Sequence, residues 1–322
     1  MTLRPRHILA VLDPAAPGQT LTTAAALADR HDAQLSVLCV VEPPHDLSIA
    51  ARMAGTGADV LLAGMTEQTR TAAAASIADA LPGRDARLSV TSGKAFIEII
   101  RHVTAEGCDF VVKSAEPLSG LSRFLFASTD QHLLRKCPCP VWLQTPGAGP
   151  APRRVIATVD LDTWDADEPE TLTHLNTRVI DAACAIGGPD AEVAVLHAWD
   201  AVGEGMIWAF AGSGDARVNA DRYVNEVMAA RQDAMETFLA RARTAHPDGP
   251  RLVPLLVRGT PETVIEGATR DPGADVVVMG TVARTGLSGV FIGNTAENII
   301  NSLACPVLAV KPDGFISPLH RG

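Results

Sequence analysis

The sequence contains no apolar run long enough to span a bilayer and no conspicuous run of basic residues. Nucleic acids and acidic lipid surfaces require a positively charged protein surface, whereas this chain has a formal net charge of -10 and a pI near 5.3. Residues 1–8 include no apolar stretch of signal-peptide length. We therefore expect a cytoplasmic protein that neither inserts into membranes nor binds nucleic acid.

Paired CxxC motifs are also missing, and the six cysteines are scattered along the chain. A chain of this size does not need disulfide bonds for stability, so we expect reduced thiols. Cys137-Pro-Cys139 suggests a metal or redox site, but a buried structural role fits Cys139 better because it leads into an apolar segment. Cys137 has no counterpart in the repeat described below and is a candidate for an exposed thiol.

Motifs that mark common catalytic sites are absent. The sequence contains no Gly-x-Ser-x-Gly, no His-Glu-x-x-His and no P-loop, and its histidines stand singly. Hydrophobic residues make up 47% of the chain, which is enough for a substantial core in each of two domains. These features favour a binding protein over an enzyme.

The 322 residues favour two domains at roughly 150 residues each, and the sequence repeats itself. Residues 93–141 align with residues 259–307 at a constant offset of 166 and without a gap. Identical pairs include Gly107/Gly273, Asp109/Asp275, Gly120/Gly286, Thr129/Thr295, Cys139/Cys305 and Pro140/Pro306. A segment rich in proline and glycine marks the boundary. We predict a first domain over residues 1–146, a linker over 147–152 and a second domain over 153–322.

Strand-like and helix-like segments alternate in the same order in both halves. This order predicts parallel βαβ units, and therefore an α/β fold with two tandem, doubly wound, five-stranded parallel sheets of Rossmann-like type. Predicted strands occupy residues 8–13, 34–41, 86–91, 109–113 and 141–144, and then 155–160, 192–199, 252–257, 275–279 and 307–310. Ligands of such sheets bind beyond the carboxyl ends of the strands, where the strand order reverses.

The residues that follow the fourth strand of the second half suggest a phosphate site. Gly280 permits a close approach of the backbone to a ligand, and Gly293-Asn294 opens the next helix. Asn294 and Glu297 are spaced as a capping pair. Free N–H groups and a positive dipole at a helix N-terminus attract anions, so this segment could hold a phosphate group; tight turns and simple capping are the alternative explanations.

With these residues the sequence resembles the universal stress protein family, over nearly its whole length. Nucleotide-binding members carry Gly-x2-Gly-x9-Gly-(Ser/Thr) here, and this chain carries Gly280-x2-Ala283-x9-Gly293-Asn294, followed by Thr295. Residues 132–142 and 293–297 resemble the tandem, E-type members most. In the first half the three glycine positions hold Ser114, Pro117 and Ala127. The resemblance thus implies a degenerate first site and a partly retained second one.

The resemblance implies a stress-response protein without known turnover. Nucleotide-binding members hold ATP with an aspartate that ends the first strand, and Asp160 takes that position in the second half. ATP with Mg²⁺ would therefore contact Asp160, Gly280, Ala283, Gly293, Asn294 and Thr295. The acidic residues 160–168 could hold the Mg²⁺, although a solvated acidic loop explains them as well. Family members pair domains through the fifth strand, which implies that the two halves pair in this way; a homodimer is also open.

Two long segments without regular pattern, residues 43–62 and 201–219, leave other functions open. The second contains Trp208 and Phe210 among glycines, which could form a lid over an apolar ligand or pack on the neighbouring half. A carrier or sensor of an acyl-type ligand is thus one alternative, and a protein-interaction module without nucleotide is another. Slow ATP hydrolysis is a third.

Overall fold

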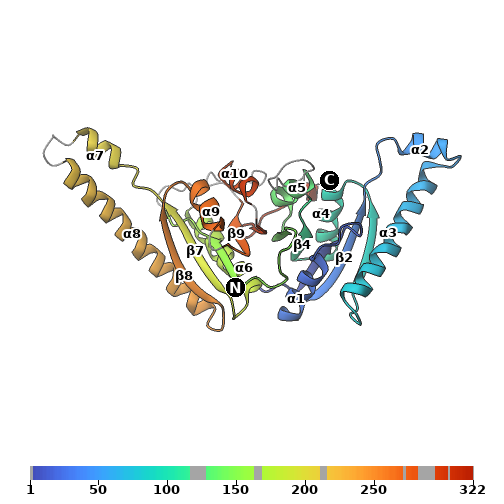
Figure 1. Ribbon diagram of the computed structural model, residues 1–322, viewed down its shortest axis with the longest axis horizontal. Helices are drawn as coiled ribbons and strands as arrows, with labels where there is room; N and C mark the ends of the chain where they lie inside the picture. The colour runs from blue at the N-terminus through green and yellow to red at the C-terminus, as the bar shows by residue number, and fades with distance from the viewer. Residues whose placement is uncertain are drawn as a thin grey trace.

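The computed structural model describes residues 3–116, 128–162, 169–210, 216–270, 273–281, 294–303 and 305–321. Its ten strands form one continuous sheet in the order β3-β2-β1-β4-β5-β10-β9-β6-β7-β8 (Figure 1). Each half contributes five parallel strands with the same internal order, and helices cover both faces. The tandem α/β fold predicted from the alternating pattern is confirmed.

In the first half the elements follow each other along the chain as strand and helix. The strands are β1 (His7–Val11), β2 (Gln34–Val41), β3 (Arg87–Ser92), β4 (Phe110–Ser114) and β5 (Val141–Gln144). The helices are α1 (Thr20–His31), α2 (Leu47–Met53), α3 (Ala58–Ala80), α4 (Ala95–Glu106) and α5 (Ser128–Lys136).

The second half repeats this order. Its strands are β6 (Arg154–Thr158), β7 (Glu192–Trp199), β8 (Arg251–Arg258), β9 (Val276–Gly280) and β10 (Val307–Val310). Its helices are α6 (Pro169–Gly187), α7 (Glu204–Phe210), α8 (Ala216–Ala245), α9 (Pro261–Arg270) and α10 (Asn294–Ser302), and a 3-10 turn follows over Pro318–Arg321.

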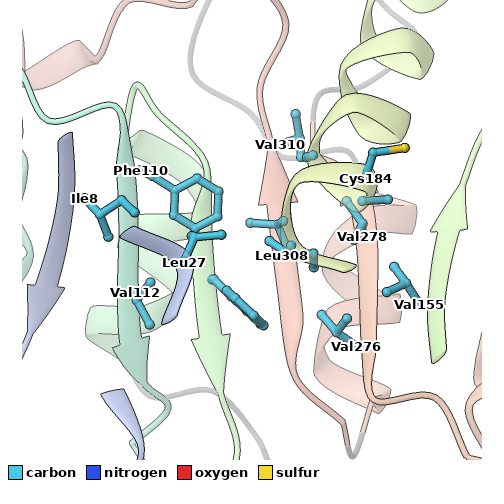
Figure 2. Packing of buried hydrophobic residues seen from close by; sticks show 14 of the residues in the cluster. Ile8, Leu27, Phe110, Val112, Val155, Cys184, Val276, Val278, Leu308 and Val310 are labelled. Carbon is cyan, nitrogen blue, oxygen red and sulfur yellow. The ribbon is translucent and has the colours of Figure 1, made fainter. Parts of the chain in front are cut away.

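The two halves join through their fifth strands. β5 and β10 pair antiparallel, with Trp142 opposite Leu308, and both side chains are buried. Figure 2 shows the packing at this junction, with Phe110 and Val112 of the first half facing Leu308 and Val278 of the second. The pairing through the fifth strand, which the family resemblance implied, is confirmed, and it buries two sheet edges that water would otherwise reach.

Each face of the sheet has one hydrophobic core that runs through both halves. Helices α1, α3, α6 and α8 supply the core on one face, and α4, α5, α9 and α10 supply the core on the other. The apolar strands β4 and β9 are buried on both faces, as parallel strands between two helical layers must be. The continuous apolar pattern of these strands follows from their central place in each half.

The equivalence of the halves extends to backbone conformation. Gly107 ends α4 with φ +67°, and its repeat partner Gly273 has φ +82°. A residue with a Cβ is strained in this left-handed region, so glycine is required at the turn into the fourth strand of both halves. The identical glycines in the repeat are thus explained by the turn.

Helices α2 and α7 correct the prediction that residues 43–62 and 201–219 are irregular. Both are short helices that pack along the long helices α3 and α8, which begin earlier than expected. Good helix formers such as Leu47 and Ala50 dominate the segment around α2, and the glycines between α2 and α3 hide this tendency. Of the two possibilities for the second segment, packing on the neighbouring half is wrong for α7, because this helix lies at the outer end of the molecule (Figure 1).

Two further expectations concern membranes and thiols. Among the described residues, no helix is both long and apolar enough to cross a membrane. All six cysteines are free and buried. The expectation of an exposed Cys137 is wrong, because its side chain is fully buried and its Sγ lies 3.6 Å from that of Cys139. It follows α5 directly, where its N–H donates to the Leu133 carbonyl and turns the side chain into the core.

Candidate ligand site in the second half

The strand order of the second half reverses between β6 and β9. These strands are parallel neighbours, with Ala157 opposite Val278. Asp160 follows β6 by two residues and Gly280 ends β9, so both lie at the carboxyl edge beside this reversal. In doubly wound sheets this is the place where ligands bind.

Asp160 is held by its neighbours through both backbone and side chain. Its N–H donates to Asn176 Oδ1 at 3.0 Å, and Asn176 Nδ2 donates to the Asp160 carbonyl at 2.6 Å. The Asp160 carboxylate accepts the N–H of Asp162 at 3.1 Å. Asn176 is buried in α6, so this helix fixes the backbone at the end of β6.

Part of this arrangement recurs in the first half. There the carboxylate of Asp13 accepts the N–H of Ala15 at 2.9 Å, in the same turn two residues ahead. The turn therefore accounts for an aspartate at the end of the first strand in both halves. What distinguishes the second half is the pair of hydrogen bonds from Asn176.

Gly280 has a clear packing role. A Cβ at this position would lie 2.6 Å from Cδ2 of Leu175, a buried residue of α6. Its first-half counterpart Ser114 fits because α1 begins differently, with Thr20 Oγ1 at 2.7 Å from Ser114 Oγ. The glycine thus lets α6 lie close to the end of β9.

We predict that Gly280→Ala lowers the free energy of unfolding by about 1–3 kcal/mol, because the new methyl group overpacks against Leu175. Denaturant unfolding of the full chain measures this difference. Gly267→Ala in α9 is the matched control, since nothing lies within 4 Å of a Cβ there and alanine favours a helix. Equal stability of Gly280→Ala and the wild type would contradict the packing role.

Thr281 connects this edge to the other half. Lys311, buried just after β10, donates from Nζ to Thr281 Oγ1 and to the carbonyl of Leu134 in α5. Burial lowers the pKa of Lys311 to about 7, although the neighbouring Cys137 thiol opposes this shift. The buried amine of Lys311 therefore links Thr281, the residue after Gly280, to the last turns of α5.

Beside Asp160, the buried side chains of His197 and Arg231 and the partly buried side chain of Asp162 form a polar cluster that the sequence did not reveal. Asp162 Oδ1 lies 2.8 Å from Arg231 Nε of α8 and 3.4 Å from His197 Nε2 of β7. Nδ1 of His197 lies 3.4 Å from the Leu161 N–H. The same Nδ1 lies 3.3 Å from the Val159 carbonyl, so the tautomer of His197 decides whether Nδ1 donates to Val159 or accepts from Leu161. The cluster fixes the two residues that follow Asp160.

This cluster revises two sequence interpretations. His197 is not isolated, because the fold brings it close to Asp162 and Arg231. These residues lie 35 positions before it and 34 positions after it in the chain. Asp162, one of the acidic residues considered for Mg²⁺, is paired with Arg231. No group of three or more metal-ligating side chains occurs among the described residues, and residues 163–168 lie outside them.

The predicted glycine motif is only partly within the described structure. Gly280 ends β9, and α10 begins at Asn294 with Thr295 as its second residue. Ala283 and Gly293 lie outside the described residues, as do Pro117 and Ala127 of the first half. The site residues predicted from sequence therefore remain predictions, apart from the positions of Asp160 and Gly280 at the strand ends.

Comparison with known proteins identifies the family of this chain. The model of the universal stress protein family matches residues 5–144 and 167–311. The chain belongs to the universal stress protein family. Both halves are matched, so it is a tandem member of the family, with the two repeats joined in one sheet.

Relatives within the family support this assignment. Universal stress protein E of Escherichia coli K12 is 30% identical over 233 residues, which are 72% of this chain and 69% of that protein. Universal stress protein E of Photorhabdus laumondii is 27% identical over 223 residues, which are 69% and 67% of the two chains. The resemblance to the tandem, E-type members is thereby confirmed.

Solved structures show that the fold is shared over the whole chain. A functionally unknown protein from Pseudomonas aeruginosa PAO1 superposes with a TM-score of 0.67 at 24% identity, covering 98% of this chain and 96% of that protein. A putative universal stress protein from P. aeruginosa UCBPP-PA14 has a TM-score of 0.65 at 23% identity, covering 98% and 97%. These similarities show that both solved proteins share the fold of this chain over nearly its whole length.

Proposed function

We propose that this tandem universal stress protein binds ATP reversibly at the carboxyl edge of its second half. The observation that carries the proposal is the position of Asp160 and Gly280 at the reversal of strand order between β6 and β9. A ligand there would meet backbone that Asn176 and the Asp162 cluster already fix, which lowers the cost of ordering the site.

In this proposal Asp160 contacts the adenosine part, as its counterpart does in nucleotide-binding members. The phosphates are held by backbone N–H groups of Gly280, Ala283, Gly293, Asn294 and Thr295 around the start of α10. Free N–H groups at a helix start recognise phosphate without any particular side chain. The alanine in place of the second glycine is therefore compatible with binding, with Mg²⁺ accompanying the triphosphate.

We propose binding without turnover, as part of a stress response. Hydrolysis would require a positioned water and a base, and no catalytic motif in the sequence supplies them. The slow ATPase alternative also relied on the acidic loop as a Mg²⁺ site, and Asp162 of that loop is engaged with Arg231. The apolar-carrier alternative relied on Trp208, whose side chain is about half exposed in α7.

A tryptophan placed at the start of α10 tests the location. We expect one ATP per chain in calorimetry with Mg²⁺, and we expect Gly293→Trp to abolish this binding by filling the space above the helix start. Ala127→Trp is the matched control, since residue 127 is the repeat counterpart of residue 293. It should leave binding unchanged.

Three other outcomes of these measurements would change the proposed function or the location of the site. Absence of binding up to millimolar ATP would contradict the proposed function and favour an apolar ligand or a protein partner. Loss of binding in Ala127→Trp but not in Gly293→Trp would move the site to the first half. Phosphate release above the blank rate would replace binding by slow hydrolysis.

A further inference from the structure

A buried ion pair lies in the first half in the segment that corresponds, at the constant offset of 166, to the proposed phosphate site of the second half. Lys113 belongs to β4, and Asp130 belongs to the first turn of α5. The Lys113 Nζ lies 2.9 Å from Asp130 Oδ1, and the two side chains are 8% and 0% exposed. An acidic residue in the first turn of a helix is common, but a fully buried one requires compensating partners.

Each oxygen of the Asp130 carboxylate has such a partner. The N–H of Glu116 donates to Asp130 Oδ2 at 2.9 Å. Lys113 also donates to Glu116 Oε1 at 2.8 Å and to the Ser114 carbonyl at 3.0 Å. Burial opposes the charge of both groups and raises the pKa of Asp130, although Lys113 and the Glu116 N–H favour the carboxylate. At Lys113, Asp130 and Glu116 outweigh burial and hold the pKa above its ordinary value.

The donors around Asp130 are those that a bound phosphate needs. An ammonium group, a backbone N–H and the positive end of a helix dipole converge on one anionic group. In this half the anionic group belongs to the chain itself.

The second half differs at each of these positions. At the constant offset of 166, Lys113 corresponds to Met279, Glu116 to Val282 and Asp130 to Ala296. α5 and α10 begin at equivalent residues, so their first turns are directly comparable. The first turn of α5 thus carries a buried carboxylate where the first turn of α10 carries only a methyl group.

We propose that Asp130 is a built-in anion that takes the place of a ligand phosphate in the first half and closes that half to nucleotides. Together with the proposed function, on which this part rests, it limits the chain to one ligand in the second half. The first half then contains a copy of the site that is always occupied, because the Asp130 carboxylate belongs to the chain and cannot dissociate.

Removing the built-in anion should create an anion site. We expect Asp130→Ala in the full chain to gain stability from inorganic phosphate, with a rise in Tm of about 3–8 °C at roughly 10 to 100 times Kd. Thermal unfolding is followed by circular dichroism at constant ionic strength, with chloride replacing phosphate. The wild type should show a smaller rise, set only by phosphate that binds in the second half, because Asp130 fills the position in the first half.

The double variant Asp130→Ala/Lys113→Met is the matched control, since it removes the ammonium group as well. It should lose the additional response and respond to phosphate as the wild type does. If Asp130→Ala does not fold without phosphate, its refolding yield against phosphate concentration replaces Tm. A variant that ignores phosphate in both measurements, or a double variant that responds equally, overturns the proposal.

The reciprocal change tests the second half. We expect Ala296→Asp, which installs the carboxylate of the first half in α10, to weaken ATP binding by about tenfold or more through charge repulsion. Ala296→Asn has the same size without the charge and should bind far better. Equal ATP affinities of the two variants overturn the proposal. Failure of the wild type to bind ATP overturns the proposed function alone, because the phosphate response of Asp130→Ala does not depend on it.

Discussion

Replacing Lys311 with methionine is expected to lower the slope of stability against pH between pH 7 and pH 10. Lys311 is buried, and its pKa falls from 10.5 to about 7 in the folded protein. Between these values the unfolded chain holds the proton and the folded chain releases it, so the contribution of Lys311 to stability rises with pH. The lysine contributes about 1.4 kcal/mol per pH unit to this rise, and about 5 kcal/mol over the whole interval. Four of the buried cysteines contribute in the opposite direction, because burial raises their pKa above 9.0.

Denaturant unfolding at pH 7, 8.5 and 10 measures the effect, with Lys94→Met, at an exposed lysine, as the matched control. At pH 7 the methionine also relieves the cost of burying an amine, although it leaves the Leu134 carbonyl and the Thr281 hydroxyl without their donor. The change in slope is therefore the more direct readout. Equal slopes in Lys311→Met and the wild type would mean that the amine is not held neutral above pH 7.

Arg231→Met is expected to lower the free energy of unfolding by about 3–5 kcal/mol. The guanidinium compensates Asp162 at 2.8 Å, and Arg231 is only 8% exposed. Without it, the largely buried carboxylate would stay beside His197 with much less compensation. Urea unfolding at pH 7 gives the difference directly.

Arg222→Met is the matched control, because Arg222 lies on the exposed face of the same helix. Adding Asp162→Asn to Arg231→Met should recover part of the loss, since the uncompensated charge is then gone. A loss below 1 kcal/mol in Arg231→Met, or no recovery in the double variant, would show that the cluster does not support the end of β6.

Most of the architecture could be predicted because local patterns of apolar residues and the internal sequence repeat indicate it. The apolar segments that became β2, β5, β7 and β10 have the predicted limits, and the reversal of strand order follows from the alternation of strands and helices. The helix α2 was missed because Gly55 and Gly57 interrupt a segment whose helical tendency lies in its alanines and leucines.

The surroundings of the candidate site could be predicted only in part. Asp160 and Gly280 end strands, and the end of a strand is visible in the sequence. The cluster of Asp162, His197 and Arg231 arises because β7 and α8 pass the end of β6, and nothing local to any one residue encodes that encounter. The burial of Cys137 likewise depends on how the end of α5 meets the core.

The antiparallel pairing of β5 with β10 also bears on how the protein responds to dilution. The two repeats meet within one polypeptide, so their association is a first-order process that does not depend on protein concentration. Because each fifth strand is already paired, neither can exchange its partner for a strand of another chain without breaking the central sheet. The pairing of the two halves is therefore the same at low and at high protein concentration.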